Sequence, residues 1–383
     1  MTANGLNKGD EHLALLFNAA FGDPRCSPRA YNLWRKCVDL DHEIGQAAFA
    51  CLPALYARLS KQAIEDDFTG RLRGICKQNW TRLRLKQDAL SEVCALMNAH
   101  AVPAQLDATC TGLADGATAR QSWYGDALEL VVPAGQSGKA LSALKDNGWR
   151  VVTPPGALPR TSLWLHGPGR QHLRLRWQVM EGVTSEAADA AIWNRAYESS
   201  LGPAKVFLPD AEDALIDLLT RPVREHETEP MRWVCAVEFL RSATDQIDWD
   251  RLVLRARELR ATRRTLAALR RLDDLVCGLP TGYAIHELER APASWLERAE
   301  ERVGRIGDAG QRPPAFARLA AYILGRTRSA GLPVIAGIPY GLAAYVRMRL
   351  ALLRSGSGNT APAEQASPPG LGLIHTLSKR GEP

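Results

Sequence analysis

The sequence predicts an α+β fold in which a small mixed β-sheet core is flanked by N-terminal and C-terminal helical regions. Apolar residues recur at helical spacing through the first hundred residues. Short β-rich runs bounded by Gly and Pro then occupy about 102–209, and helical spacing returns after Pro209. One helical run, 138–147, lies between two of the expected strands, so the central segment combines both kinds of element.

The chain divides into five expected segments. The expected strands share apolar or alternating composition and lie at 128–132, 149–152, 162–165, 173–179 and 206–208. Asp210 is a predicted N-cap for the helix that follows the last strand. The segments are an N-terminal helical region (1–100), an α/β core (101–209), a C-terminal helical domain (210–328), an apolar and basic helix (329–354) and a flexible tail (355–383).

Bulk composition excludes several classes of function. The chain has 48 Lys and Arg against 42 Asp and Glu, a net charge of +6, so we expect a weak preference for anionic partners and no specific nucleic acid. Its eight cysteines form no C-x-x-C pair, which argues against zinc and redox motifs and indicates a reducing, cytoplasmic compartment. The first residues contain charges and no apolar run, so we expect no signal peptide.

The segment 332–353 is apolar but contains Pro333, Pro339, Arg347 and Arg349. A membrane-spanning helix needs roughly 20 predominantly apolar residues without central charges. We therefore expect a packing helix here, and peripheral contact with a membrane surface is the less favoured alternative.

Three stretches carry a family resemblance: VPAQLDATCTGLADGATARQSWYGDALELVV (102–132), HLRLRWQV (172–179) and the helical segment 232–280, with its Ile-Asp-Trp helix start and closing Leu-Pro. Together they resemble a bacterial family of uncharacterised nucleotidyltransferases, distant relatives of the polymerase-β-like enzymes. In that family a strand ends in Leu-Lys-Gly, an Arg and a Gly-Asp-x-Asp strand follow, and a later strand carries an Asp and a His-Trp pair. The resemblance implies a nucleoside triphosphate substrate and Mg²⁺.

The metal ligands that this chemistry needs are only partly present. Nucleotidyl transfer uses two divalent cations about 3.5–4 Å apart, held by carboxylates. Asp126 follows Gly125 where the resemblance places the first Asp, but Leu128 stands at the second position. Glu129 is three residues after Asp126, so on a regular strand it points to the opposite face, and only a bulge would bring it back.

Arginines stand where further ligands are expected. Arg174 takes the place of the acid on the later strand and is followed by Arg176, while the Lys-Gly position falls on Asp107 and the motif's Arg corresponds to Arg120. Arg120, Gly125, Arg174 and Arg176 are therefore candidates for binding a nucleotide or another anion without metal. The alternative is a solvated strand face whose intervening Leu residues pack inside.

Two hypotheses follow for the function. The first is a catalytically degenerate family member that acts as a binding or accessory protein with an unknown protein partner. The second is an active, Mg²⁺-dependent enzyme that uses Asp126 and Glu129 as catalytic residues, with Asp126 as a metal ligand. His226 is a further candidate, because relatives often carry a histidine there. The basic side chains of 71–86 and of the Arg-rich stretch 255–271 are expected to form solvated helix faces.

Overall fold

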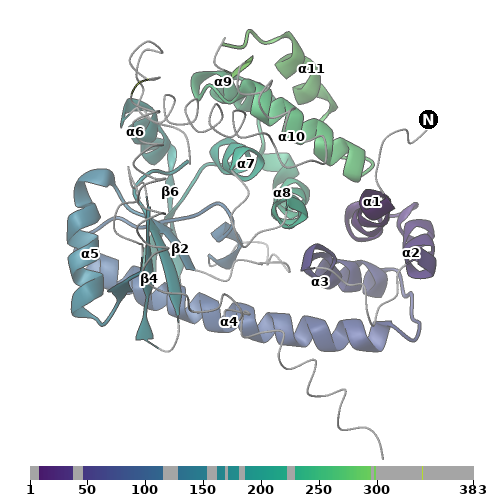
Figure 1. Ribbon diagram of the computed structural model, residues 1–383, viewed down its shortest axis with the longest axis horizontal. Helices are drawn as coiled ribbons and strands as arrows, with labels where there is room; N and C mark the ends of the chain where they lie inside the picture. Colours follow the sequence, from purple (N-terminus) through teal and green to yellow (C-terminus); the bar gives the residue numbers. More distant parts are fainter. Residues whose placement is uncertain are drawn as a thin grey trace, which may run out of the picture.

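Helices flank a mixed β-sheet on both sides, as the sequence predicts (Figure 1). The computed structural model describes residues 8–37, 46–114, 128–152, 162–168, 171–180, 186–221, 229–294, 297–298 and 339. The predicted helix at 329–354 (apart from residue 339) and the predicted flexible tail at 355–383 lie outside these residues. No helix in the described part of the chain combines the length and apolar character needed to cross a membrane.

The helices fall into three groups along the chain. Four precede the sheet: α1 (Lys8–Phe21), α2 (Ser27–Cys37), α3 (Gln46–Lys61) and α4 (Thr69–Ala99). Two lie within the sheet region: α5 (Ser137–Asp146) and α6 (Glu186–Arg195). The C-terminal group is α7 (Ala211–Thr220), α8 (Glu229–Ala243), α9 (Trp249–Glu258), α10 (Thr262–Leu275) and α11 (Gly282–Arg290).

The sheet has seven described strands in the order β3-β4-β5-β2-β1-β7-β6. They are β1 (Gln105–Leu106), β2 (Leu128–Val131), β3 (Arg150–Val151), β4 (Ser162–His166), β5 (His172–Arg176), β6 (Tyr197–Leu201) and β7 (Ala204–Leu208). The pairs β2–β5 and β1–β7 are parallel and the other pairs are antiparallel. The strands β1 and β6 and the helix α6 were not predicted as elements.

The two faces of the sheet pack against different helices. Leu128 and Leu130 of β2 and Leu173 and Leu175 of β5 belong to an apolar core with α4 and α5. On the opposite face, Val131 joins a core that contains α7 and the other helices of the N- and C-terminal groups. The candidate site lies on this second face, between the sheet and α7.

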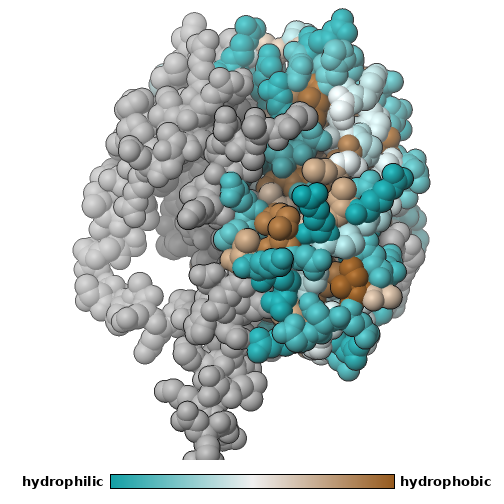
Figure 2. Space-filling model, turned by 90° about the vertical axis from the view of Figure 1, so that its right-hand side faces the viewer, coloured by the Kyte–Doolittle hydropathy of each residue, from teal (hydrophilic) through white to brown (hydrophobic). Residues whose placement is uncertain are grey.

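Helices from the two ends of the chain share this second core. The Asn18 side chain of α1 donates to the Leu275 carbonyl of α10 (2.9 Å) and accepts from the Cys277 backbone N–H (2.9 Å). The surface seen from the side of these helices is mostly hydrophilic, with hydrophobic residues in small separate groups (Figure 2). Scattered groups of this size are usual for a folded protein and do not by themselves indicate a partner.

Local signals in the sequence account for several helix ends. Asp210 caps α7 as predicted, because its side chain accepts from the Glu212 backbone N–H. Asp248 caps α9 through the Arg251 backbone N–H. The Arg-rich stretch differs most from the expected solvated face at Arg255, which is buried and contacts the carboxylates of Asp210 and Glu212.

Candidate functional site

Strand pairing places Glu129, Arg174 and Arg176 on one face of the sheet. The strands β2 and β5 are parallel and in regular register, with Glu129 opposite Arg174 and Val131 opposite Arg176. Side chains alternate along a strand, so these residues face α7, whereas Leu128 and Leu173 face α4 and α5. The Glu129 carboxylate lies 3.9 Å from a terminal nitrogen of each of the two arginines.

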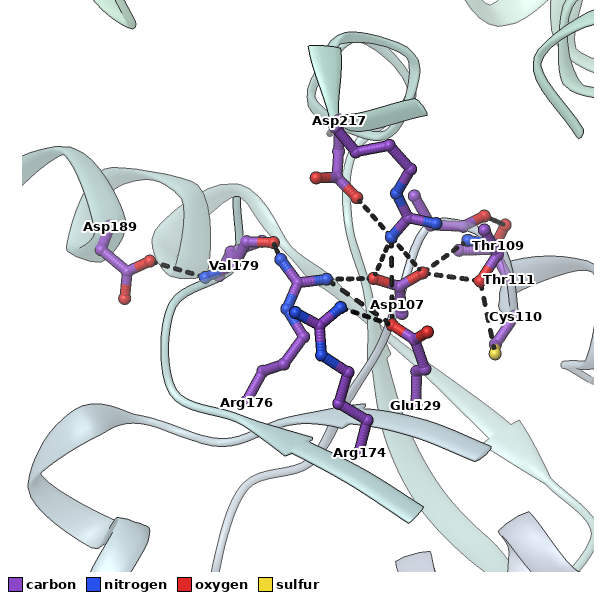
Figure 3. Close-up of polar contacts among 12 residues, drawn as sticks. Asp107, Thr109, Cys110, Thr111, Glu129, Arg174, Arg176, Val179, Asp189 and Asp217 are labelled. Carbon is purple, nitrogen blue, oxygen red and sulfur yellow. Dashed lines mark hydrogen bonds and ion pairs between the residues drawn. The ribbon is translucent and has the colours of Figure 1, made fainter. Parts of the chain in front are cut away.

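Asp107, just after β1, accepts hydrogen bonds from three neighbouring residues (Figure 3). Its carboxylate accepts from the backbone N–H and the hydroxyl of Thr109, at 3.0 and 2.6 Å. It also accepts from the guanidinium groups of Arg176 and Arg221. The Asp107 side chain is fully buried, so these donors replace the water that the charge loses.

Arg221 connects the sheet to α7. It follows the last residue of α7, and its Nη2 lies 2.8 and 2.9 Å from the two carboxylate oxygens of Asp107. The same nitrogen lies 3.9 Å from Glu129 and 3.4 Å from Asp217, one turn earlier. We define the buried charge cluster as three acids and three arginines: Asp107, Glu129, Asp217, Arg174, Arg176 and Arg221. Its formal charge is zero.

The segment after β5 is held by the same network. Arg176 donates through Nη2 to the Val179 carbonyl (2.7 Å), and the Val179 N–H donates to Asp189 of α6 (2.8 Å). Burial raises the pKa of Asp189, and the Val179 hydrogen bond and the charge of Arg176 act in the opposite direction. The cluster therefore fixes β5, the segment after it and α6 relative to the sheet.

Arg174 lies at the outer edge of the buried charge cluster. Its side chain is 11% exposed against 1% for Arg176, and its guanidinium carbon is 5.8 Å from the ring centre of Trp164 on β4. Further along the same face, the exposed His166 and His172 stack edge to face with ring centres 4.5 Å apart. Arg174 is thus the cluster arginine nearest to solvent.

The register corrects one expectation drawn from the sequence. Leu128 and Arg174 were expected to mark ligand positions of one site, but they lie on opposite faces of the sheet. Glu129 is the β2 residue that shares the face of Arg174, and no bulge interrupts the described β2–β5 pairing. The expected solvated face is also wrong, because both arginines of β5 are buried, although the leucines between them pack inside as predicted.

Several candidate residues cannot be placed. Arg120, Gly125, Asp126 and His226 lie outside the described residues. Arg176 is described, but its guanidinium is bound to Asp107 and the Val179 carbonyl and is closed to a dissolved anion.

Two members of the cluster were missed by the sequence reasoning. Asp217 and Arg221 stand four residues apart at the end of an apolar helical run, a spacing that predicts an ion pair on one helix face. A charged pair within an apolar run was the available signal that this pair would be buried.

In the part of the chain that the structure describes, the contacts of this cluster join the sheet to α7, and its acids are occupied by arginines. Among the described residues, no three His, Cys, Asp or Glu side chains come together as metal ligands would. A cation at Glu129 would lie close to three guanidinium groups. These arginines would repel the cation and Asp107 and Asp217 would attract it, so the arginines oppose a cation mainly by occupying the carboxylate oxygens.

Because the buried charge cluster is closed to solvent, we predict that the neighbouring thiol of Cys110 reacts slowly with thiol reagents. Burial is the main cause that raises its pKa to about 12, and its sulfur lies 3.7 Å from the Thr109 hydroxyl beside Asp107. At pH 8 we expect Cys110 to react with a thiol reagent about 1,000-fold more slowly than an ordinary thiol, because the thiolate is the reactive form. Exposed Cys26 and Cys277 serve as internal references, followed by peptide mass mapping. Equal labelling of all three would contradict a closed site.

Comparison with known proteins finds a family whose sequence model matches this chain. The model of a family described as "Uncharacterised nucleotidyltransferase" matches residues 47–276, more than half of the 383-residue chain. The matched range contains β1 to β7 and every member of the buried charge cluster. No curated protein matches the sequence.

Proposed function

The chain belongs to this family of uncharacterised nucleotidyltransferases, and we propose that it is a catalytically degenerate member that acts as a binding or accessory protein in a bacterial biosynthetic pathway. The observation that supports this most strongly is the pairing of Asp107 with Arg176 and Arg221 on the face of the sheet that also carries Glu129. Acids on this face neutralise arginines and join the sheet to α7.

Charge balance is the physical basis of the proposal. A site for divalent cations needs an excess of carboxylate oxygens, whereas the buried charge cluster contains three acids and three arginines. Opening it to admit a metal would leave buried guanidinium groups without their partners, which is strongly unfavourable. We therefore predict that ligand binding does not require a metal ion.

The ligand that this proposal favours is a nucleotide or another anion that contacts Arg174. This arginine is at the edge of the cluster and next to the ring of Trp164, which is 36% exposed. A guanidinium group donates charge-assisted hydrogen bonds to a phosphate or carboxylate, and an indole ring offers a stacking surface to a base. Arg120 would be a second contact in this proposal.

The test is isothermal titration with ATP, CTP, GTP and UTP, each with and without Mg²⁺. We expect heat of binding that does not depend on Mg²⁺ and an affinity at least about tenfold lower in Arg174→Ala, because one charge-assisted contact is lost. Lys145→Ala on α5, an exposed basic residue, is the matched control and should bind as the wild type does. Binding that requires Mg²⁺ would contradict the proposal.

The alternative is an active, Mg²⁺-dependent nucleotidyltransferase with an unknown acceptor, which would use Asp126 and Glu129. The position of Glu129 favours it, because this carboxylate shares a sheet face with position 174 of β5, where the family resemblance expects an acid. Under this alternative, binding of a nucleoside triphosphate requires Mg²⁺ and is lost in both Asp126→Ala and Glu129→Gln. The Arg174→Ala variant would then bind Mg²⁺ and nucleotide more tightly, because a repulsive charge is removed.

A further inference from the structure

The middle of α4 carries a surface that the candidate site does not use. Leu72, near the start of the helix, belongs to the core shared by the N- and C-terminal helices, and Leu90 belongs to the core under the sheet. Between them α4 spans the two cores along the lower edge of the described part of the molecule (Figure 1). Large apolar side chains are nevertheless exposed there: Trp80 is 60% exposed and Leu85 is 65% exposed.

Basic residues line up with Trp80 on this helix. Arg73, Lys77, Trp80 and Arg84 follow the spacing i, i+4, i+7, i+11, which places them in one stripe at 3.6 residues per turn. All four side chains are exposed. At 1.5 Å rise per residue the stripe is about 16 Å long. We refer to these four residues as the α4 stripe.

No ion pair within 4 Å neutralises the cations of the α4 stripe in the described part of the chain, and Glu65 acts on Arg73 only at longer range. Arg73 contacts the Tyr56 hydroxyl at 3.2 Å, and Arg84 contacts the Gln87 amide at 2.8 Å and lies 5.5 Å from the ring centre of Trp80. None of the ion pairs of the described residues includes Arg73, Lys77 or Arg84. The stripe therefore presents three positive charges around one exposed indole.

We propose that the α4 stripe binds single-stranded nucleic acid without sequence preference, with phosphates on Arg73, Lys77 and Arg84 and a base stacked on Trp80. Cations that follow the backbone and an aromatic ring on which a base stacks are the two components of such sites. A stripe of about 16 Å spans four or five nucleotides at a stacked rise of about 3.4 Å. This proposal does not depend on the proposed function of the sheet face.

An acidic membrane is a poorer fit to the same residues. A helix on a membrane surface inserts a continuous apolar face. The two large apolar side chains exposed on α4, Trp80 and Leu85, are five residues apart and point about 140° away from each other around the helix. Only one of them could enter a bilayer at a time, whereas a single indole between cations is sufficient to stack one base.

The experiment is fluorescence anisotropy of a short fluorescein-labelled oligothymidylate with the full chain, repeated over a series of salt concentrations. Three phosphate contacts predict a slope of log K against log salt of about −2. Lys77→Gln/Arg84→Gln should reduce the slope to about −0.7, because one contact remains. Lys139→Gln/Lys145→Gln on α5 removes the same charge from another exposed helix and should leave the slope unchanged.

Stacking is tested separately from charge. Trp80→Ala should weaken binding by about 5- to 150-fold with the salt slope unchanged, and Trp80→Phe should recover part of the affinity. All substituted side chains are exposed, so the thermal midpoint should stay close to that of the wild type, which separates loss of binding from loss of fold. Equal affinity of Trp80→Ala and wild type, or loss of the same affinity in the α5 control, would overturn the proposal. Binding to polyglutamate or to anionic vesicles with equal affinity would also overturn it.

Discussion

Asp107→Ala is expected to lower the free energy of unfolding by about 3–5 kcal/mol. The substitution leaves Arg176 and Arg221 buried without their shared carboxylate, and removal of one partner from a buried ion pair has a cost of this size. Chemical denaturation followed by circular dichroism measures the change.

Two further variants show whether the loss of stability in Asp107→Ala comes from the removal of a charge or from the burial of its unpaired partners. Asp67→Ala removes an acid that pairs with Arg35 but is 87% exposed, so little change in stability is expected. The quadruple variant Asp107→Leu/Arg176→Met/Asp217→Leu/Arg221→Met removes two acids and two arginines and leaves Glu129 with Arg174, so it should recover most of the stability that the single variant loses. A loss below about 1 kcal/mol in Asp107→Ala would mean that the cluster is open to water.

Arg255→Met is expected to cost a similar amount, about 3–5 kcal/mol, at a second ionic contact. Arg255 of α9 lies 3.1 Å from Glu212, 3.1 Å from Asp210 and 3.5 Å from Asp213. The side chains of Arg255, Glu212 and Asp213 are 7%, 2% and 0% exposed, so the substitution removes the buried cation shared by the acids at the start of α7 and leaves them only the more exposed Arg195 and Arg251. Arg251→Met is the matched control, because Arg251 contacts Asp210 and Glu212 but is 50% exposed, and a loss below about 1 kcal/mol is expected.

The pKa of Asp210 provides a second measurement on the Arg255→Met variant. Burial raises the pKa of Asp210, but the hydrogen bonds and charge of Arg255 outweigh it and hold that pKa well below its ordinary range. A carboxyl with a depressed pKa stabilises the folded state above its unfolded pKa of about 3.9, and this contribution is lost as pH falls through the folded value. In Arg255→Met the pKa of Asp210, followed by NMR, should rise toward the ordinary value. An unchanged pKa would contradict the role assigned to Arg255.

The fold class was predictable because hydrophobic spacing is a local signal. The apolar strands β2 and β5 and the caps Asp210 and Asp248 can be identified from a few neighbouring residues. The edge strand β6 (YESSL) was missed because its composition is mostly polar, as an edge tolerates.

The candidate site was less predictable because its contacts are distant in sequence. Arg176 is 69 residues and Arg221 is 114 residues from Asp107, and no local pattern connects them. The face of Glu129 depended on its register with β5, which the spacing from Asp126 could not supply. Charge balance in the cluster emerged only when both strands and α7 were placed together.

The most direct measurement of the central claim is Mn²⁺ binding by electron paramagnetic resonance, with Mn²⁺ in place of Mg²⁺ and ATP present. A charge-neutral cluster predicts no protein-bound Mn²⁺ beyond the complex of Mn²⁺ with ATP, and identical spectra for the wild type and Glu129→Gln. A protein-bound Mn²⁺ signal that disappears in Glu129→Gln would contradict the account and identify this chain as a metal-dependent nucleotidyltransferase.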